Sequence, residues 1–179
     1  MIDPAIGALL AGALALLFAS AALHKLRSLA QFAAALRAYR VLPESLAGLA
    51  WLVPLLELTI AASLLVRSSR AGACAAGAAL LSVYAAAIAI NLQRGRRDLA
   101  CGCGGPNERR PIAPWMVGRN LLLAALLAAL LLPWRARALD TADALTIGAG
   151  TAVAALLYLS LERLLAGSGP LTALMRRPA

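Results

Sequence analysis

The stretch AIGALLAGALALLFASAAL, residues 5–23, decides the class of fold because it contains no charged residue. About 20 apolar residues are needed for a helix to cross the hydrocarbon core of a bilayer. Four more apolar runs of similar length follow at residues 46–66, 71–92, 115–132 and 142–161. A segment in lipid has to satisfy its backbone hydrogen bonds internally, so each run is expected to be a helix. The sequence therefore predicts an all-α, polytopic membrane helix bundle.

The first run is expected to remain a transmembrane helix rather than to act as a cleaved signal peptide. Its N-terminal flank, MIDP, has Asp3 and no basic residue, whereas the positive cluster His24-Lys25-Leu26-Arg27 follows the apolar run. This order is the reverse of the secretory pattern.

The net charge of +9 does not indicate a nucleic-acid partner, because most arginines lie in short loops beside the apolar runs. There they contact lipid headgroups and set the orientation of the helices. The loops after the first and third runs have more basic residues than the alternate loops. We therefore expect the N-terminus outside a bacterial inner membrane, and residues 93–114 and the C-terminal tail on the cytoplasmic side.

The two cytoplasmic loops differ in pattern. Residues 28–41 place Leu29, Phe32, Leu36 and Tyr39 at spacings of three and four, which predicts a short amphipathic helix at the membrane interface. Ser28, with Gln31 three residues later, predicts a capping box at its start. The alternative is an ordinary cytoplasmic extension of the first helix.

The second cytoplasmic loop, residues 93–114, contains LACGCGGPNERRP with Cys101 and Cys103. A disulfide across one residue closes a strained ring, which favours thiol exchange over a permanent crosslink. Five arginines in this loop favour the reactive thiolate. A redox pair is the preferred interpretation, while a soft-metal site and two ordinary cysteines are alternatives. No metal is expected, because the single histidine, His24, lies in the other loop.

Several further residues are candidates within or beside the apolar runs. Glu57 is a functional candidate because an ionised side chain at this depth needs a partner, a proton or a polar cavity, although a structural role is the alternative. Lys25 and Arg119 either pair with Glu57 or extend to the headgroups. A polar cluster on the cytoplasmic side is expected from His24, Lys25, Asn91, Arg119 and Asn120. Cys74 is expected to be a small buried apolar residue near the outer side.

Four strings, in this order, resemble the methylamine utilisation protein MauE family, relatives of the DoxX-like membrane proteins. They are AALHKLRSLAQFAAALRAYRVLP, WLVPLLELTIAASLL, INLQRGRRDLACGCGG and RNLLLAALL. The most specific matches are Lys25, Tyr39 with Pro43, the proline and glutamate Pro54 and Glu57, the Arg-Gly pair before Cys-Gly-Cys, and Arg119-Asn120.

The resemblance implies a DoxX-like four-helix domain at residues 1–132, followed at 133–179 by a fifth transmembrane helix and a basic tail. It also implies an accessory role in methylamine metabolism, by thiol-disulfide exchange with a thioredoxin-like partner during maturation of a periplasmic amine dehydrogenase. Cys101 and Cys103 would be the redox pair. The resemblance assigns no role to the other matching residues, which are Lys25, Tyr39, Glu57, Arg119 and Asn120.

Other functions stay open at this point. A non-catalytic membrane scaffold and a small transporter using Glu57 are the alternatives, and no motif identifies a cofactor such as a membrane quinone. Whether the chain is itself a thiol-disulfide oxidoreductase is also open. The implied maturation occurs outside the inner membrane, while the loop charges place Cys101 and Cys103 inside. Either reducing equivalents pass into or across the membrane, or the loops are inverted relative to the rule.

Overall fold

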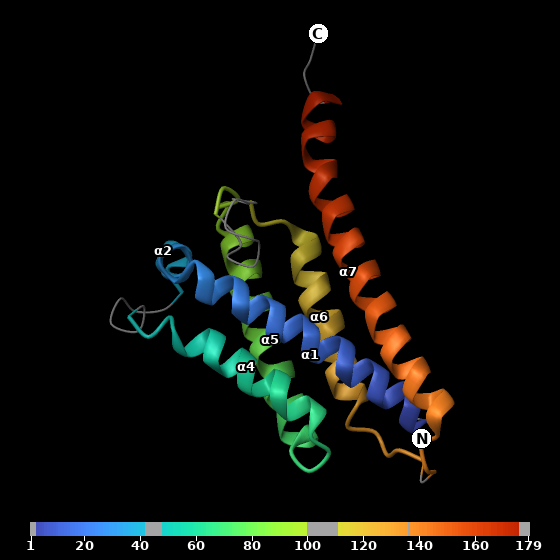
Figure 1. Cartoon of the computed structure of the whole chain (residues 1–179). Coiled ribbons are helices and arrows are strands. Elements are labelled where there is room, and N and C mark those ends of the chain that lie inside the picture. Colours follow the sequence, from blue (N-terminus) through green and yellow to red (C-terminus); the bar gives the residue numbers. More distant parts are fainter. Residues whose placement is uncertain (1–2, 42–47, 100–110, 136, 176–179) are drawn as a thin grey trace.

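The computed structural model describes residues 3–41, 48–99, 111–135 and 137–175, with side chains up to Leu161 and at Leu164. The described chain is built of α-helices, and their order confirms the all-helical, polytopic character expected from the sequence (Figure 1). The helices are α1 (Pro4–Arg27), α2 (Leu29–Tyr39), α4 (Leu52–Leu65), α5 (Arg70–Gln93), α6 (Pro114–Ala129) and α7 (Thr141–Met175).

Local signals explain where α1 begins and ends. The side chain of Asp3 accepts a hydrogen bond from the backbone N–H of Ala5 at 2.9 Å, and Pro4 occupies the first turn, where its missing N–H is not needed. Lys25 and Arg27 lie in the last turn, where positive charge offsets the negative end of the helix dipole. α1 is therefore well defined at both ends.

α1, α4, α5 and α6 enclose the main hydrophobic core. Phe18 of α1, Leu64 of α4 and Leu127 of α6 are almost completely buried there. Gly77 of α5 faces all three helices: a Cβ atom at this position would lie 2.9 Å from Leu127 Cδ1, 3.2 Å from Phe18 Cζ and 3.3 Å from Ile60 Cγ2. The absence of a side chain at Gly77 therefore lets α5 approach its three neighbours closely.

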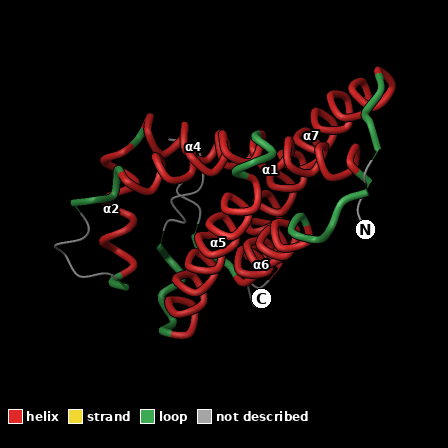
Figure 2. Tube along the Cα trace, turned by 90° about the horizontal axis from the view of Figure 1, so that it is seen from below, coloured by secondary structure: helices red, strands yellow, loops and turns green. Residues whose placement is uncertain are grey.

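α7 lies outside this four-helix core and packs along α1 (Figures 1 and 2). The contact is close: the Oγ1 atom of Thr151 donates to the carbonyl of Leu9 at 3.4 Å, and Gly12 faces the Thr151 side chain. Leu156 and Leu157 remain more than 60% exposed. An apolar helix with one packed side and an exposed apolar remainder is suited to contact with lipid.

The five apolar runs do not all form helices of spanning length. α1, α5 and the Thr141–Leu161 part of α7 are long and apolar enough to cross a membrane. α4 has 14 residues and α6 has 16, so at 1.5 Å per residue they reach about 21 and 24 Å, less than the core thickness of about 30 Å. α4 starts late because Pro54 is tolerated only in a first helical turn.

α2 is a separate helix and not an extension of α1. Ser28, between them, has φ −135° and ψ 46°, which interrupts the helical backbone. The expected capping box is wrong, since the Ser28 side chain makes no capping hydrogen bond. Ser28 instead closes α1 through its backbone N–H, which donates to Lys25 O at 3.3 Å, and it does not adopt the extended backbone of an N-cap. The amphipathic pattern is confirmed, because Arg37 is exposed and Tyr39 is buried.

Candidate functional site

Cys101 and Cys103 lie outside the described residues, as does Pro43. The chain on both sides of the cysteine segment is described. The backbone N–H of Ile112 donates to the carbonyl of Leu99 at 3.0 Å, so the two flanks of the segment meet. Leu99 and Ile112 also pack with Tyr39 and Ile88 in a small hydrophobic cluster. The segment therefore leaves and re-enters the bundle beside the C-terminal end of α2.

Lys25 of α1 and Glu57 of α4 form a buried ion pair. Lys25 Nζ lies 2.6 Å from Glu57 Oε1 and 2.9 Å from Oε2, and the two side chains are only 3% and 1% exposed. Tyr84 of α5 donates its hydroxyl proton to Glu57 Oε1 at 2.9 Å. The pairing of Lys25 with Glu57, one of two expectations for this lysine, is what the structure shows.

Aromatic rings lie around the Lys25 ammonium group. Its Nζ is 5.6 Å from the centre of the Phe32 ring and 5.4 Å from that of Tyr84. Such distances allow a cation–π attraction, which is stronger in a water-poor environment. Because two carboxylate contacts and two rings compensate the charge of Lys25, an ionised pair is sustainable at this depth.

A second polar group fastens α2 to the end of α5. Arg96 donates to the carbonyls of Ala38 at 2.7 Å and Tyr39 at 3.5 Å, and to Asn91 Oδ1 at 3.1 Å. Asn91 is fully buried and donates to Ala87 O at 3.0 Å. Arg96 thus satisfies carbonyls that the end of α2 leaves without helical partners.

The described contacts connect some members of the expected polar cluster. Lys25 and Glu57 meet directly, whereas Asn91 belongs to the Arg96 group. On α6, Asn120 is buried, and the Arg119 guanidinium lies 5.5 Å from the Trp115 ring centre. His24 is half-buried.

Sequence reasoning missed two residues of these groups, Tyr84 and Arg96. Tyr84 is a hydroxyl-bearing residue inside an apolar run, which is a signal for a buried hydrogen bond. In the sequence, Arg96 is one positive charge among several in its loop, because nothing in the local pattern shows that its guanidinium reaches α2.

Cys74 is a free thiol and is fully buried in the core, as expected for a small apolar residue. Among the side chains that the structure describes, no group of three or more His, Cys, Asp or Glu residues is arranged to hold a metal ion.

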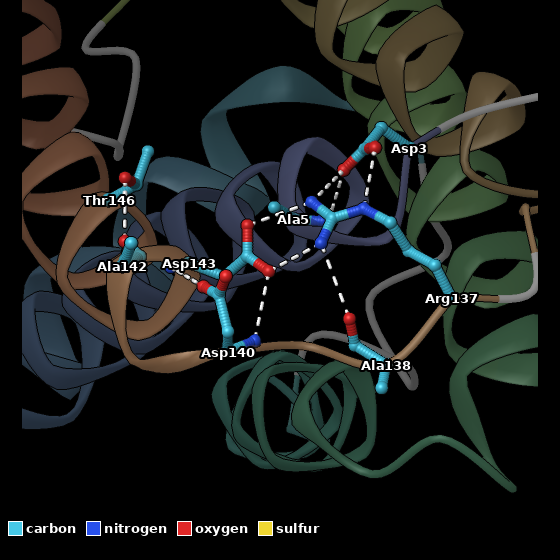
Figure 3. Close-up of polar contacts among 8 residues, drawn as sticks. All are labelled: Asp3, Ala5, Arg137, Ala138, Asp140, Ala142, Asp143 and Thr146. Carbon is cyan, nitrogen blue, oxygen red and sulfur yellow. Dashed lines mark hydrogen bonds and ion pairs between the residues drawn. The ribbon is translucent and has the colours of Figure 1, made fainter.

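A third polar group lies at the opposite end of the bundle (Figure 3). Arg137 donates to Asp3 at 3.0 Å and to Asp143 at 2.8 Å, so it joins the start of α1 to the start of α7. Asp140 and Asp143 exchange backbone-to-side-chain hydrogen bonds of 2.8 and 3.0 Å at the first turn of α7. The Arg137 hydrogen bond, followed by that from the Ala5 N–H, lowers the pKa of Asp3 below its usual 3.8.

An apolar cavity of about 80 Å³ lies beside the Lys25–Glu57 pair, between α2, α4 and α5. It is lined by Phe32, Ala35, Leu36, Tyr39, Val53, Tyr84, Ala87 and Ile88. Several positions of the predicted amphipathic face of residues 28–41 therefore form one wall of this cavity.

Comparisons with known proteins agree on one family. The family model described as methylamine utilisation protein MauE matches residues 3–135. The chain is 43% identical over 150 residues to the methylamine utilization protein MauE of Paracoccus denitrificans, covering 82% of this chain and 80% of that protein. It is 40% identical to the protein of the same name from Paracoccus versutus, covering 90% and 88%. The same-named protein of Methylophilus methylotrophus is 36% identical, covering 89% and 86%. No solved structure matches the chain.

Proposed function

Because the chain belongs to the methylamine utilisation protein MauE family, we propose that it serves methylamine utilisation as a membrane partner in thiol-disulfide exchange. In this proposal a thioredoxin-like protein is the exchange partner, and the disulfides are destined for a periplasmic amine dehydrogenase or a similar enzyme. The four-helix domain at residues 1–132 holds the reactive loop at one end, and the remainder supplies the fifth helix and basic tail. The protein resides in the bacterial inner membrane.

The observation that carries the proposal is the anchoring of both flanks of the Cys-Gly-Cys segment. The Leu99–Ile112 hydrogen bond and the contacts of both residues with Tyr39 fix where the segment begins and ends. Arg96, five positions before Cys101, is held by the α2 carbonyls and Asn91. Two cysteines one residue apart, in a loop whose sequence contains five arginines and whose flanks are held in this way, are suited to attack on a partner disulfide.

The exchange is a balanced two-step reaction. A thiolate of the pair attacks one sulfur of the partner disulfide, forming a mixed disulfide and releasing the partner's other sulfur as a thiolate. The second thiolate of the pair then attacks the mixed disulfide. The Cys101–Cys103 disulfide forms and the partner leaves as a dithiol, and the reverse sequence oxidises the partner.

Removing the cysteines tests the proposal. In cells that need this chain for growth on methylamine, we expect Cys101→Ser and Cys103→Ser each to abolish maturation of the dehydrogenase, measured as its activity in the periplasmic fraction. The matched control is Cys74→Ala, which removes the free thiol buried in the core and should leave maturation intact. Full activity of both serine variants would reject the exchange reaction and leave the scaffold function in its place.

A further inference from the structure

The cavity between α2, α4 and α5 follows the inward face of the amphipathic helix α2. Four of its lining residues, Phe32, Ala35, Leu36 and Tyr39, recur on α2 at spacings of three and four. The helix rises by about 10 Å from Phe32 to Tyr39, so the cavity extends along most of α2. Its walls are almost wholly apolar and offer water almost no hydrogen-bond partner. An apolar cavity of this kind gains from being filled by an apolar group.

Positive charge is held at the Tyr39 end of this cavity. Arg94 donates through Nη1 to the carbonyl of Arg40 at 3.4 Å, and Arg96 donates to the carbonyl of Tyr39 at 3.5 Å. Both guanidinium groups therefore lie against the backbone at, or next to, the last α2 residue that lines the cavity. Arg94 is exposed, and so is Arg40, so these side chains are accessible from outside the protein.

The sequence around that end has an excess of positive charge. Residues 29–40 and 93–99 together contain five arginines and one acidic residue, Asp98. A guanidinium is planar and presents paired N–H donors that match the oxygens of a phosphate. Basic clusters at a membrane surface attract anionic lipid headgroups. An apolar cavity and an anion-binding end therefore lie side by side at α2.

We propose that the cavity binds an acyl chain of an anionic phospholipid, whose phosphate contacts Arg94 at the end of α2. The bilayer supplies both parts of this ligand at an interfacial, amphipathic helix. The acyl chain needs no hydrogen-bond donor from the apolar walls, and the charge of the phosphate is met outside them. This inference goes beyond the proposed thiol exchange and stands or falls without it.

Binding is measured by native mass spectrometry of the purified full-length protein in detergent, titrated with dioleoylphosphatidylglycerol. Dioleoylphosphatidylcholine is the reference lipid, because it has the same acyl chains and no net charge. We expect the phosphatidylglycerol to bind about fivefold more tightly or more, which is the factor that one basic residue contributes near an anionic membrane surface. Equal affinity for the two lipids would overturn recognition of an anionic headgroup.

The headgroup contact has its own pair of variants. Arg94→Gln should weaken the binding of phosphatidylglycerol about fivefold and leave that of phosphatidylcholine unchanged. Arg67→Gln is the matched control, because it removes one exposed arginine from the turn between α4 and α5, at the other end of α5. The same loss in both variants would indicate attraction to net charge alone and would reject the contact with Arg94.

The acyl-chain contact is tested from two helices, so that the folding of α2 alone does not decide the result. Ala35→Phe fills the cavity from α2 and Ala87→Leu fills it from α5, and each should weaken the binding of phosphatidylglycerol about tenfold or more. Their controls, Ala34→Phe and Ala86→Leu, add the same groups at exposed positions of the same helices and should bind normally. Unchanged affinity in both filled variants would overturn the cavity as the site.

A competition experiment separates the lipid from a free phosphate compound. Glycerol 3-phosphate carries the charge without the acyl chains, so at equimolar concentration it should leave the bound phosphatidylglycerol in place. Displacement by glycerol 3-phosphate would show that the phosphate alone is recognised and would reject the lipid as the ligand.

Discussion

Lys25 Nζ lies 2.6 Å from Glu57 Oε1, and 97% or more of each side chain is withdrawn from solvent. The pair joins α1 to α4, and Tyr84 extends it to α5. Three helices of the core therefore share one charged contact at the end of the bundle that carries the cysteine segment.

Breaking this pair on one side should destabilise the fold strongly. Lys25→Met or Glu57→Leu leaves a buried, uncompensated charge, so we expect each to lower the free energy of unfolding by about 3–5 kcal/mol. The combined Lys25→Met/Glu57→Leu variant should recover most of that loss, because no unpaired charge remains. Thermal unfolding in detergent measures all three, and a combined variant as unstable as the single ones would contradict the argument.

Arg96 should control the position of α2. Arg96→Gln removes charged donors to the Ala38 and Tyr39 carbonyls, which are worth about 1.5–3 kcal/mol per hydrogen bond. We expect faster hydrogen exchange across residues 29–39. Arg97→Gln, which removes an exposed charge next to it, is the control and should leave exchange in α2 unchanged. Identical exchange in the two variants would show that Arg96 does not hold α2.

The contact between Asp3 and Arg137 should give the stability a dependence on acidic pH. The pKa of Asp3 is lowered in the folded protein, so its contribution is complete above the unfolded value near 3.8 and is lost as pH falls through the lower folded value. Thermal unfolding measured as pH falls from 5 should show this loss in the unmodified chain and a smaller one in Arg137→Gln. Asp98→Asn, which changes an exposed carboxylate elsewhere, should behave like the unmodified chain.

Two glycines of α5 should respond oppositely to alanine. At Gly77 the new methyl group would meet Leu127 Cδ1 at 2.9 Å, and such overpacking costs about 1–3 kcal/mol. At Gly72 it would meet nothing within 4 Å, so Gly72→Ala should stabilise by about 0.5–1 kcal/mol through helix propensity. Unfolding curves of the two variants that shift in the same direction would contradict the close packing at Gly77.

The side of the membrane that carries the cysteines can be measured with a membrane-impermeant maleimide on Cys74→Ala spheroplasts. From the loop charges we expect Cys101 and Cys103 to react only after the membrane is permeabilised. Ser68→Cys/Cys101→Ser/Cys103→Ser, in the same background, places a single thiol at the exposed turn between α4 and α5 and should react without permeabilisation. The opposite pattern would show that the loops are inverted.

The sequence predicted the features that depend on composition and helical period. The apolar runs predicted the helices of the core, and the helical period of residues 28–41 predicted which side of α2 faces inward. The small apolar side chain of Cys74 predicted that this residue is buried. The cost of an unpaired charge in a membrane was sufficient to make Lys25 a candidate partner of Glu57.

The features that the sequence did not predict depend on tertiary contacts. Arg96 reaches α2 across more than 50 positions of sequence, and Tyr84 meets Glu57 only because α4 and α5 pack together. Ser28 has the residue type of an N-cap, but the close succession of α1 and α2 gives its backbone another role. The apolar run at residues 46–66 is also longer than α4, because apolar residues before or after a helix lengthen a run as much as helical residues do.

The two ion pairs of α1 have a joint consequence for its freedom of movement. Lys25 near one end is paired with Glu57, and Asp3 at the other end is paired with Arg137. Sliding α1 by one helical turn, about 5.4 Å, would separate both pairs at once. The register of α1 is thus fixed at two points about a membrane thickness apart, and the helix is suited to act as the stationary reference against which α2 and α7 are positioned.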